Sequence, residues 1–144
     1  MLKIVFTALL VIIIVSILVK GLKRAPKPVY FVGPHGSGKT VSILSLQSLP
    51  NKTVTTTINH KIFYKNREIY ELVPDDSAQD FFRKFHINPD GNYVFFVKNE
   101  EELDSFPDCS PYNITFVIWK KVETKSRKDL IYLDESPEQL KKVI

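Results

Sequence analysis

The sequence predicts an α/β domain with a mostly parallel sheet and helices on both of its faces, preceded by one N-terminal transmembrane helix. Three observations lead to this fold class. Along residues 29–144, short apolar and β-branched runs alternate with stretches of helical spacing, which is typical of parallel sheets. A glycine-rich loop at 33–40 lies between one such strand and one such helix. An uncharged apolar run occupies residues 4–19 and precedes the domain.

Composition divides the chain into three expected parts: a transmembrane signal-anchor helix with a basic flank at 1–24, a stiff linker with two prolines at 25–28, and a single domain at 29–144. Four of the 20 Lys and Arg residues lie in the first part, which leaves 16 basic residues to balance all 16 acidic ones. Because the basic excess belongs to the anchor flank, we expect no direct DNA binding. Cys109 is the only cysteine, so no intrachain disulfide forms.

The apolar run at 4–19 contains only two polar residues, Thr7 and Ser16, and with its neighbours approaches the ~20 residues that a spanning helix needs. A cleaved signal peptide is one alternative, but no small-x-small cleavage site follows the run. A buried core helix is another, but the run is apolar on every face. Basic residues after the run predict a single-pass protein of the lipid bilayer with a cytosolic C-terminal domain.

Within the domain, the residue pattern predicts seven strands, at 29–32, 53–58, 61–64, 68–73, 93–97, 113–119 and 130–133. It predicts four helices, at 41–49, 77–85, 99–106 and 136–144. Lys65-Asn66-Arg67 is typical of a turn, so that residues 53–73 form an antiparallel hairpin at one edge of the sheet. Ser77 is expected to cap the helix at 77–85.

The loop matches the G-x-x-x-x-G-K-[ST] pattern of nucleotide-binding proteins, with the residues Gly33, Pro34, His35, Gly36, Ser37, Gly38, Lys39 and Thr40. Its glycines allow backbone N–H groups to surround a β-phosphate, and the following helix adds its positive end. We expect Lys39 to reach the β- and γ-phosphates and the Thr40 hydroxyl to bind Mg²⁺. Chance produces such a match in roughly 0.5% of chains of this length. His35 falls where side chains crowd the γ-phosphate and would hinder attack by water.

With its anchor, its short linker and the run Ser37-Gly38-Lys39-Thr40, the sequence resembles the beta subunits of the signal recognition particle receptor. These are small membrane-anchored GTPases of the endoplasmic reticulum. The resemblance implies a P-loop NTPase fold of the small G-domain kind, GTP and Mg²⁺ as ligands, and the receptor's alpha subunit as the partner in protein targeting. It also implies that Thr56 is a second Mg²⁺ ligand in the first switch. A β-prone threonine run in an edge strand is the alternative for Thr56.

The same resemblance assigns three residues to the nucleobase. Lys121 matches the lysine of the family's N-K-x-D motif, whose stem lies over the base, and Glu123 keeps a carboxylate able to accept from guanine. Lys120 stands where the family has Asn. Ser136 matches the serine of the base-side S-A-K loop. The alternative for Lys121 and Glu123 is that they are solvated surface charges.

The stretch that matches the second switch departs from the family's D-x-P-G-H. Pro74 fits, but Asp75 replaces the glycine whose N–H contacts the γ-phosphate. Asp75 and Asp76 would also add negative charge near a bound anion, which is unfavourable. Glu71 is the candidate replacement for the acidic residue on the Mg²⁺ side, one position out of register. After Pro74 the nearest Gln is Gln79, so we assign no catalytic residue and expect weak or no GTP hydrolysis.

Three functions are therefore considered. The first is a GTP-binding subunit that docks the alpha subunit at the endoplasmic reticulum, with nucleotide ordering the docking surface. The second is a membrane-anchored P-loop ATPase or nucleotide kinase, which needs a carboxylate at the end of an apolar strand; Glu71 is the only candidate. The third is a P-loop-fold membrane scaffold with little nucleotide turnover.

Overall fold

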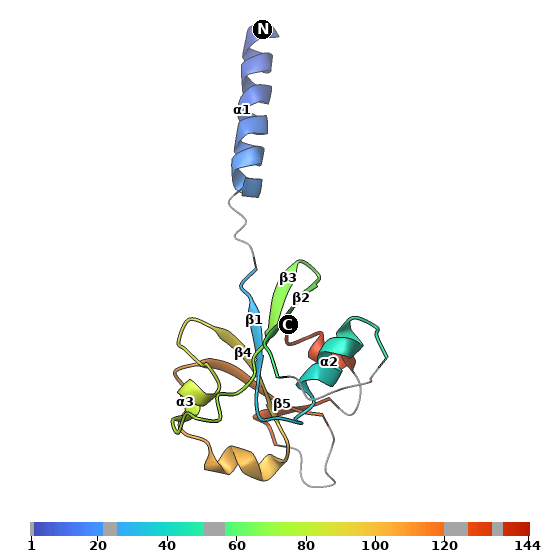
Figure 1. Cartoon of the computed structure of the whole chain (residues 1–144). Helices are drawn as coiled ribbons and strands as arrows, with labels where there is room; N and C mark the ends of the chain where they lie inside the picture. The colour runs from blue at the N-terminus through green and yellow to red at the C-terminus, as the bar shows by residue number, and fades with distance from the viewer. Residues whose placement is uncertain (1, 22–25, 51–56, 120–126, 134–136) are drawn as a thin grey trace.

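The computed structural model describes residues 2–21, 26–50, 57–119, 127–133 and 137–144. These residues form a mixed α/β structure around a six-stranded, mostly parallel sheet (Figure 1). In chain order the elements are α1 (Leu2–Gly21), β1 (Val29–Val32), α2 (Lys39–Leu46), β2 (His60–Tyr64), β3 (Arg67–Glu71), α3 (Phe81–Lys84), β4 (Asn92–Val97), the 3₁₀ helix η1 (Glu100–Ser105), β5 (Asn113–Ile118), β6 (Leu130–Tyr132) and α4 (Pro137–Leu140).

The sheet has the strand order β2-β3-β1-β4-β5-β6. Only the edge strand β2 runs antiparallel to its neighbour, as the predicted hairpin requires, while β3, β1, β4, β5 and β6 are parallel. In the hairpin turn, Lys65 and Asn66 adopt φ values of 47° and 64°. Two successive left-handed residues are what a two-residue hairpin turn needs to match the twist of its strands.

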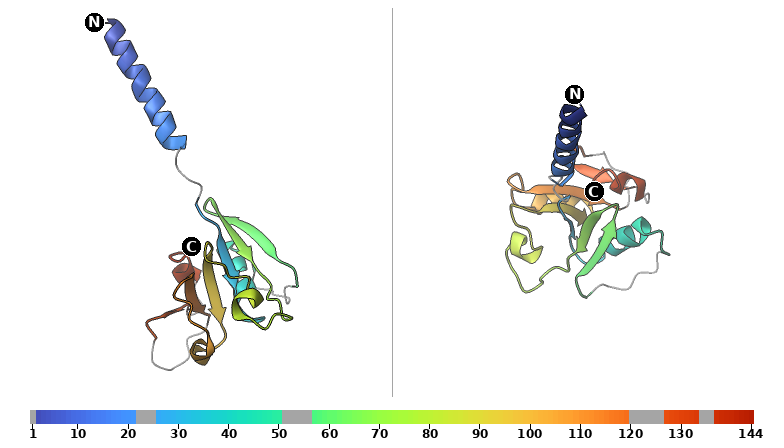
Figure 2. Two further views of the ribbon diagram at one scale, coloured as in Figure 1. Left: turned by 90° about the vertical axis from the view of Figure 1, so that its left-hand side faces the viewer. Right: turned by 90° about the horizontal axis from the view of Figure 1, so that it is seen from above.

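Helices cover both faces of the sheet. Figure 1 and the right-hand view of Figure 2 place α2 and α4 on one side and α3 on the other. Side chains of β4 alternate between the two faces, so that Phe96 joins the core beneath α2 and α4, while Phe95 joins the core with Phe85. Because both faces of β4 are covered, its residues 93–97 are all buried, as expected for a central parallel strand.

The helix predicted at 77–85 begins later than expected. It starts at Phe81, and the carboxylate of Asp80 caps it by accepting from the Arg83 N–H at 2.9 Å. The Ser77 hydroxyl, the predicted cap, instead donates to Asp75 at 2.6 Å. The prediction failed because several short polar side chains in this stretch are able to cap a helix, and their spacing does not rank them. The C-terminal helix is also shorter than predicted, ending at Leu140.

The prediction that the N-terminal helix spans a membrane is wrong. Residues 2–21 do form a helix, α1, drawn apart from the sheet in Figure 1, with exposed side chains at 5–7 and 9–17. Neither α1 nor any other helix in the described part of the chain is long and apolar enough to cross a membrane. The uncharged run between Lys3 and Lys20 has 16 residues, which at 1.5 Å per residue is about 24 Å, short of a ~30 Å hydrocarbon core. The same finding contradicts the predicted location, a single-pass protein of the endoplasmic reticulum membrane. It also contradicts the predicted bilayer contact through residues 4–19 and the cytosolic C-terminal domain that followed from it.

Candidate phosphate-binding site

The glycine-rich loop lies at the carboxyl end of the parallel strands. It leaves β1, which lies between β3 and β4, and enters α2 at Lys39. In open α/β sheets, ligands bind outside the carboxyl ends of the strands. The N–H groups of the first turn of α2 therefore face the region in which a phosphate group is expected.

Two of the loop glycines occupy positions that no other residue fits well. Gly33 has φ 136°, and a β-carbon added to it would lie 2.3 Å from the carbonyl oxygen of Phe96. Gly38 has φ 95°, and a β-carbon there would lie 3.2 Å from Cβ of Trp119. The loop therefore depends on glycine for its backbone conformation and for its close approach to β4 and β5.

Lys39 is buried, with 6% of its surface exposed, and its side chain folds back across the loop. Its Nζ donates to the carbonyl oxygens of Gly33 at 2.7 Å and Pro34 at 2.8 Å. Burial lowers the pKa of Lys39 to about 8; the negative charge of Glu71 opposes this shift and the positive charge of Lys98 adds to it. An ammonium group held against the loop backbone in this way is placed to meet a bound anion.

A third hydrogen bond within the loop comes from Ser37. Ser37 is buried, and its hydroxyl donates to the Pro34 carbonyl oxygen at 2.9 Å. This carbonyl thus accepts from both Ser37 and Lys39. Together with the Lys39–Gly33 bond, these hydrogen bonds connect the two ends of the loop over residues 33–39. Unlike Gly33 and Gly38, Gly36 has no atom of the described residues within 4 Å of the position that a β-carbon would take, although its φ of 74° also favours glycine.

Thr40 and Glu71 meet at the start of α2. The Thr40 hydroxyl donates to Oε1 of Glu71 at 2.6 Å. Glu71 ends β3 and is paired with Phe31 of β1, so the parallel register brings it beside the loop. Glu71 is 1% exposed, and among the described residues its second oxygen, Oε2, is buried without a hydrogen-bond partner. A buried carboxylate oxygen in this condition is costly unless another group binds it.

The Thr40–Glu71 pair fits Mg²⁺. Both side chains offer oxygen atoms, and Mg²⁺ in nucleotide sites uses one or two carboxylates together with phosphate oxygens and water. Among the described residues no three His, Cys, Asp or Glu side chains converge as a metal site. Any Mg²⁺ bound here would therefore take most of its ligands from the nucleotide and from water. Glu71 would be the carboxylate on the metal side that the resemblance assigns to an Asp.

The two aspartates that follow β3 oppose the binding of an anion less than the sequence suggested. The Asp75 carboxylate accepts from the N–H of Ser77 at 3.0 Å and from its hydroxyl, and these bonds lower the pKa of Asp75. Its own N–H donates to the Lys84 carbonyl oxygen at 2.8 Å, so it is engaged away from the phosphate loop. Asp76 lies 3.5 Å from Nε2 of His35 and 3.3 Å from Nζ of Lys84. Its charge therefore has basic partners, one of them in the loop itself.

Two residues beside the loop were not predicted. Lys98 directly follows β4, and its charge acts on Lys39. Trp119 directly follows β5, and its side chain lies against Gly38. The signal available in the sequence was position, because each is the first residue after a buried strand predicted to be parallel. Residue type alone gave no reason to select either.

Four predicted site residues, Thr56, Lys121, Glu123 and Ser136, lie outside the described residues. Their assigned contacts with Mg²⁺ and the base stay predictions. The same holds for Lys120. The described part of the site thus consists of the complete loop 33–40, Glu71, the segment 74–76, Lys98 and Trp119.

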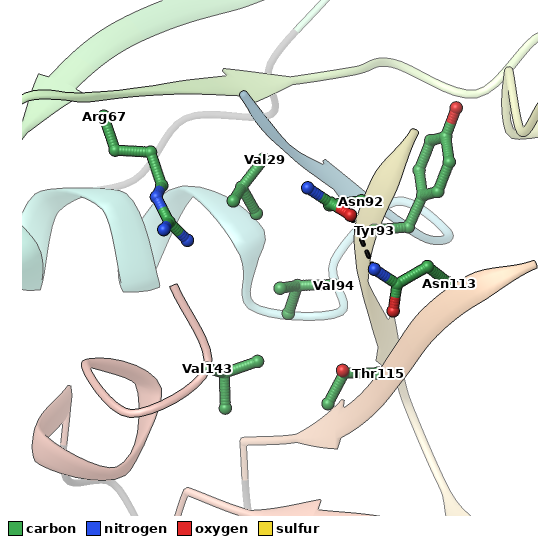
Figure 3. A pocket seen from close by; sticks show the side chains of 8 residues that line it. All are labelled: Val29, Arg67, Asn92, Tyr93, Val94, Asn113, Thr115 and Val143. Carbon is green, nitrogen blue, oxygen red and sulfur yellow. Dashed lines mark hydrogen bonds between the residues drawn. The ribbon is translucent and has the colours of Figure 1, made fainter. Parts of the chain in front are cut away.

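A separate pocket of about 190 Å³ opens at the opposite end of the sheet (Figure 3), lined by Val29, Arg67, Asn92, Tyr93, Val94, Asn113, Thr115 and Val143. Val29, Asn92 and Asn113 are the first residues of β1, β4 and β5. In Figure 3 the Asn113 side chain points to that of Asn92, to which it donates a hydrogen bond. This pocket is at the amino ends of the strands and is distinct from the phosphate loop. It does not have the position at which parallel sheets bind nucleotides.

No known protein family and no curated protein matches this sequence.

Proposed function

We propose that the chain binds a nucleoside triphosphate with Mg²⁺ in the loop 33–40 and uses the bound nucleotide to present a docking surface to a partner protein. The observation that carries this proposal is the hydrogen bond between Thr40 and the buried Glu71. It joins a loop hydroxyl to a carboxylate on the neighbouring strand, and one oxygen of that carboxylate has no hydrogen-bond partner in the part of the chain that the structure describes. Lys39 supplies the positive charge on the same loop.

The nucleotide proposed from the resemblance is GTP, and the proposed partner is the alpha subunit of the signal recognition particle receptor. The segment 74–76 gives a physical route from ligand to surface. Asp76 faces His35 of the loop and Lys84 of α3. A γ-phosphate arriving near His35 would compete with Asp76 for that side chain and favour a different arrangement of the segment.

Isothermal titration calorimetry of the full chain tests the binding step. Mg-GTP should bind with one site per chain, and Lys39→Ala or Thr40→Ala should abolish the signal. Lys61→Ala is a matched control, since this lysine belongs to the edge strand β2 and its amine pairs with Glu68 of β3. Absence of binding to the unaltered chain, or full binding by Lys39→Ala, would refute the proposal.

A pull-down with the alpha subunit tests the docking step. Recruitment by the GTP-loaded chain should exceed recruitment by the nucleotide-free chain, and Lys39→Ala should behave like the nucleotide-free chain. Recruitment of equal strength in all three preparations would mean that docking does not depend on nucleotide.

The ATPase or nucleotide kinase alternative gains one supporting observation. Its required carboxylate at a strand end is present, because Glu71 is the last residue of β3. A steady-state assay of phosphate release separates the two functions. Sustained release from ATP, lost in Glu71→Gln, would favour the enzyme, while binding without release would favour the docking protein.

A further inference from the structure

We infer that Trp119 forms part of the nucleobase end of the site and binds the base by stacking, which does not discriminate guanine from adenine. This inference rests on the proposed function, since it concerns the same nucleotide. The observation behind it is the position of Trp119 relative to the Thr40–Glu71 pair, at which Mg²⁺ is expected.

The direction of the nucleotide follows from the Thr40–Glu71 pair. A Mg²⁺ ion held by Thr40 and Glu71 would lie at the terminal phosphates of the nucleotide, so the pair would mark that end of the ligand. Glu71 belongs to β3, and the strands follow in the order β3-β1-β4-β5. Asp76, which follows β3 in the chain, also lies 3.5 Å from Nε2 of His35. The ribose and base therefore extend away from β3, across the start of α2, towards the carboxyl ends of β4 and β5.

Trp119 is the first residue after β5, at the carboxyl end of that strand. A β-carbon on Gly38 would lie 3.2 Å from its Cβ, 3.5 Å from its Cγ and 3.8 Å from its Cδ2, so the indole adjoins the last glycine of the loop. The side chain also packs against the core cluster beneath α2 and α4, which fixes its position, and it remains only partly buried. The indole is thus held beside Gly38 of the phosphate loop before any ligand arrives.

The chemistry of this surface is that of a stacking partner. An indole presents a large apolar π-face, and stacking of a base on an aromatic side chain is worth about 5- to 150-fold in affinity. Every base has a π-face, so such a contact does not depend on which purine is bound. This contact should therefore contribute equally to the affinities for ATP and GTP. Any preference between the two nucleotides would come from hydrogen bonds elsewhere.

Intrinsic fluorescence of the full chain gives a direct test, because Trp119 is its only tryptophan. Mg-ATP and Mg-GTP should both change the emission on titration. Tripolyphosphate, which has the phosphates but no base, should bind the loop, as measured by calorimetry, with little change in emission. Equal emission changes with tripolyphosphate and with the nucleotides would overturn the inference.

Affinity measurements on two variants complete the test. Trp119→Leu should weaken Mg-ATP and Mg-GTP by the same factor, between about 5- and 150-fold, and leave tripolyphosphate affinity unchanged. Trp119→Phe keeps an aromatic ring and should retain most of the affinity. Loss of tripolyphosphate binding in Trp119→Leu would mean that Trp119 only supports the loop. Unchanged nucleotide affinity would mean that Trp119 does not bind the base. Either result would overturn the inference. If the unaltered chain binds neither tripolyphosphate nor nucleotide, the proposed function itself fails, and this inference fails with it.

Discussion

The hydroxyl of Thr40 and the carboxylate of Glu71 are joined by a 2.6 Å hydrogen bond although 31 positions separate them in the chain. The bond exists because β1 and β3 are parallel neighbours, with Phe31 in register with Glu71. Thr40 comes from the helix that follows β1, and Glu71 closes β3. The start of α2 and the end of β3 are thereby connected through one pair of side chains.

Replacing Glu71 by Gln tests whether this pair serves Mg²⁺. The amide oxygen of Gln still accepts from Thr40, so the fold should persist, but the negative charge is lost. We expect the gain in nucleotide affinity that Mg²⁺ provides to fall by about 10- to 100-fold, as for other groups that support a metal site. Calorimetry with Mg²⁺ and with EDTA measures this gain. A variant that keeps the whole Mg²⁺-dependent gain would show that Glu71 has no part in metal binding.

Lys39 predicts a pH dependence of anion binding. Burial holds its pKa at about 8 in the empty protein, and a bound phosphate favours the charged form, so the complex has a higher pKa. Affinity for tripolyphosphate should therefore be steady below about pH 8 and fall by up to about tenfold per pH unit above it. Titration calorimetry between pH 7 and 10 gives the profile.

Lys98→Ala is the matched variant for that experiment. Removing a like charge near Lys39 should raise the pKa of Lys39, so the fall in affinity should begin at higher pH. A profile that stays flat to pH 10 in the unaltered chain would mean that protonation of Lys39 does not control binding.

Local patterns in the sequence were enough for the centre of the fold. The strand at 29–32, the glycine loop and the start of the following helix depend on neighbouring residues, and the structure has β1 and α2 there. The turn at 65–66 likewise forms the β2–β3 hairpin. These features follow from hydrophobic periodicity and turn residues, which act over a few positions.

Features that depend on distant residues were not predicted with the same success. Glu71 was a candidate for the metal side, but only the register of β1 with β3 places it against Thr40. The contact of Trp119 with Gly38 likewise requires the order of β1, β4 and β5 in the sheet. The membrane-spanning prediction failed for another reason, since it relied on hydropathy near the lower limit of length.

Asp76 should tune affinity for the terminal phosphate. Its carboxylate lies 3.5 Å from His35 and so places a negative charge beside the expected anion. We expect Asp76→Ala to raise affinity for nucleoside triphosphate by about 2- to 5-fold, with a smaller effect on diphosphate and a weaker effect at high salt, as for other exposed charges. Competition binding at two salt concentrations measures this. Asp90→Ala is the control, because Asp90 precedes β4 at the opposite end of the sheet. Equal effects of both variants would mean that the change in affinity comes from the net charge of the chain and not from the position of Asp76.

Gly33 and Gly36 provide a matched pair for testing the loop geometry. An alanine at either position has an unfavourable positive φ, which costs about 1–2 kcal/mol. At Gly33 the added β-carbon would also approach the Phe96 carbonyl oxygen to 2.3 Å, whereas at Gly36 it would meet no atom of the described residues within 4 Å. We therefore expect Gly33→Ala to lower the free energy of unfolding by about 2–5 kcal/mol and Gly36→Ala by about 1–2 kcal/mol. Urea denaturation of both variants measures the difference, and equal losses would contradict the close packing of Gly33 on β4.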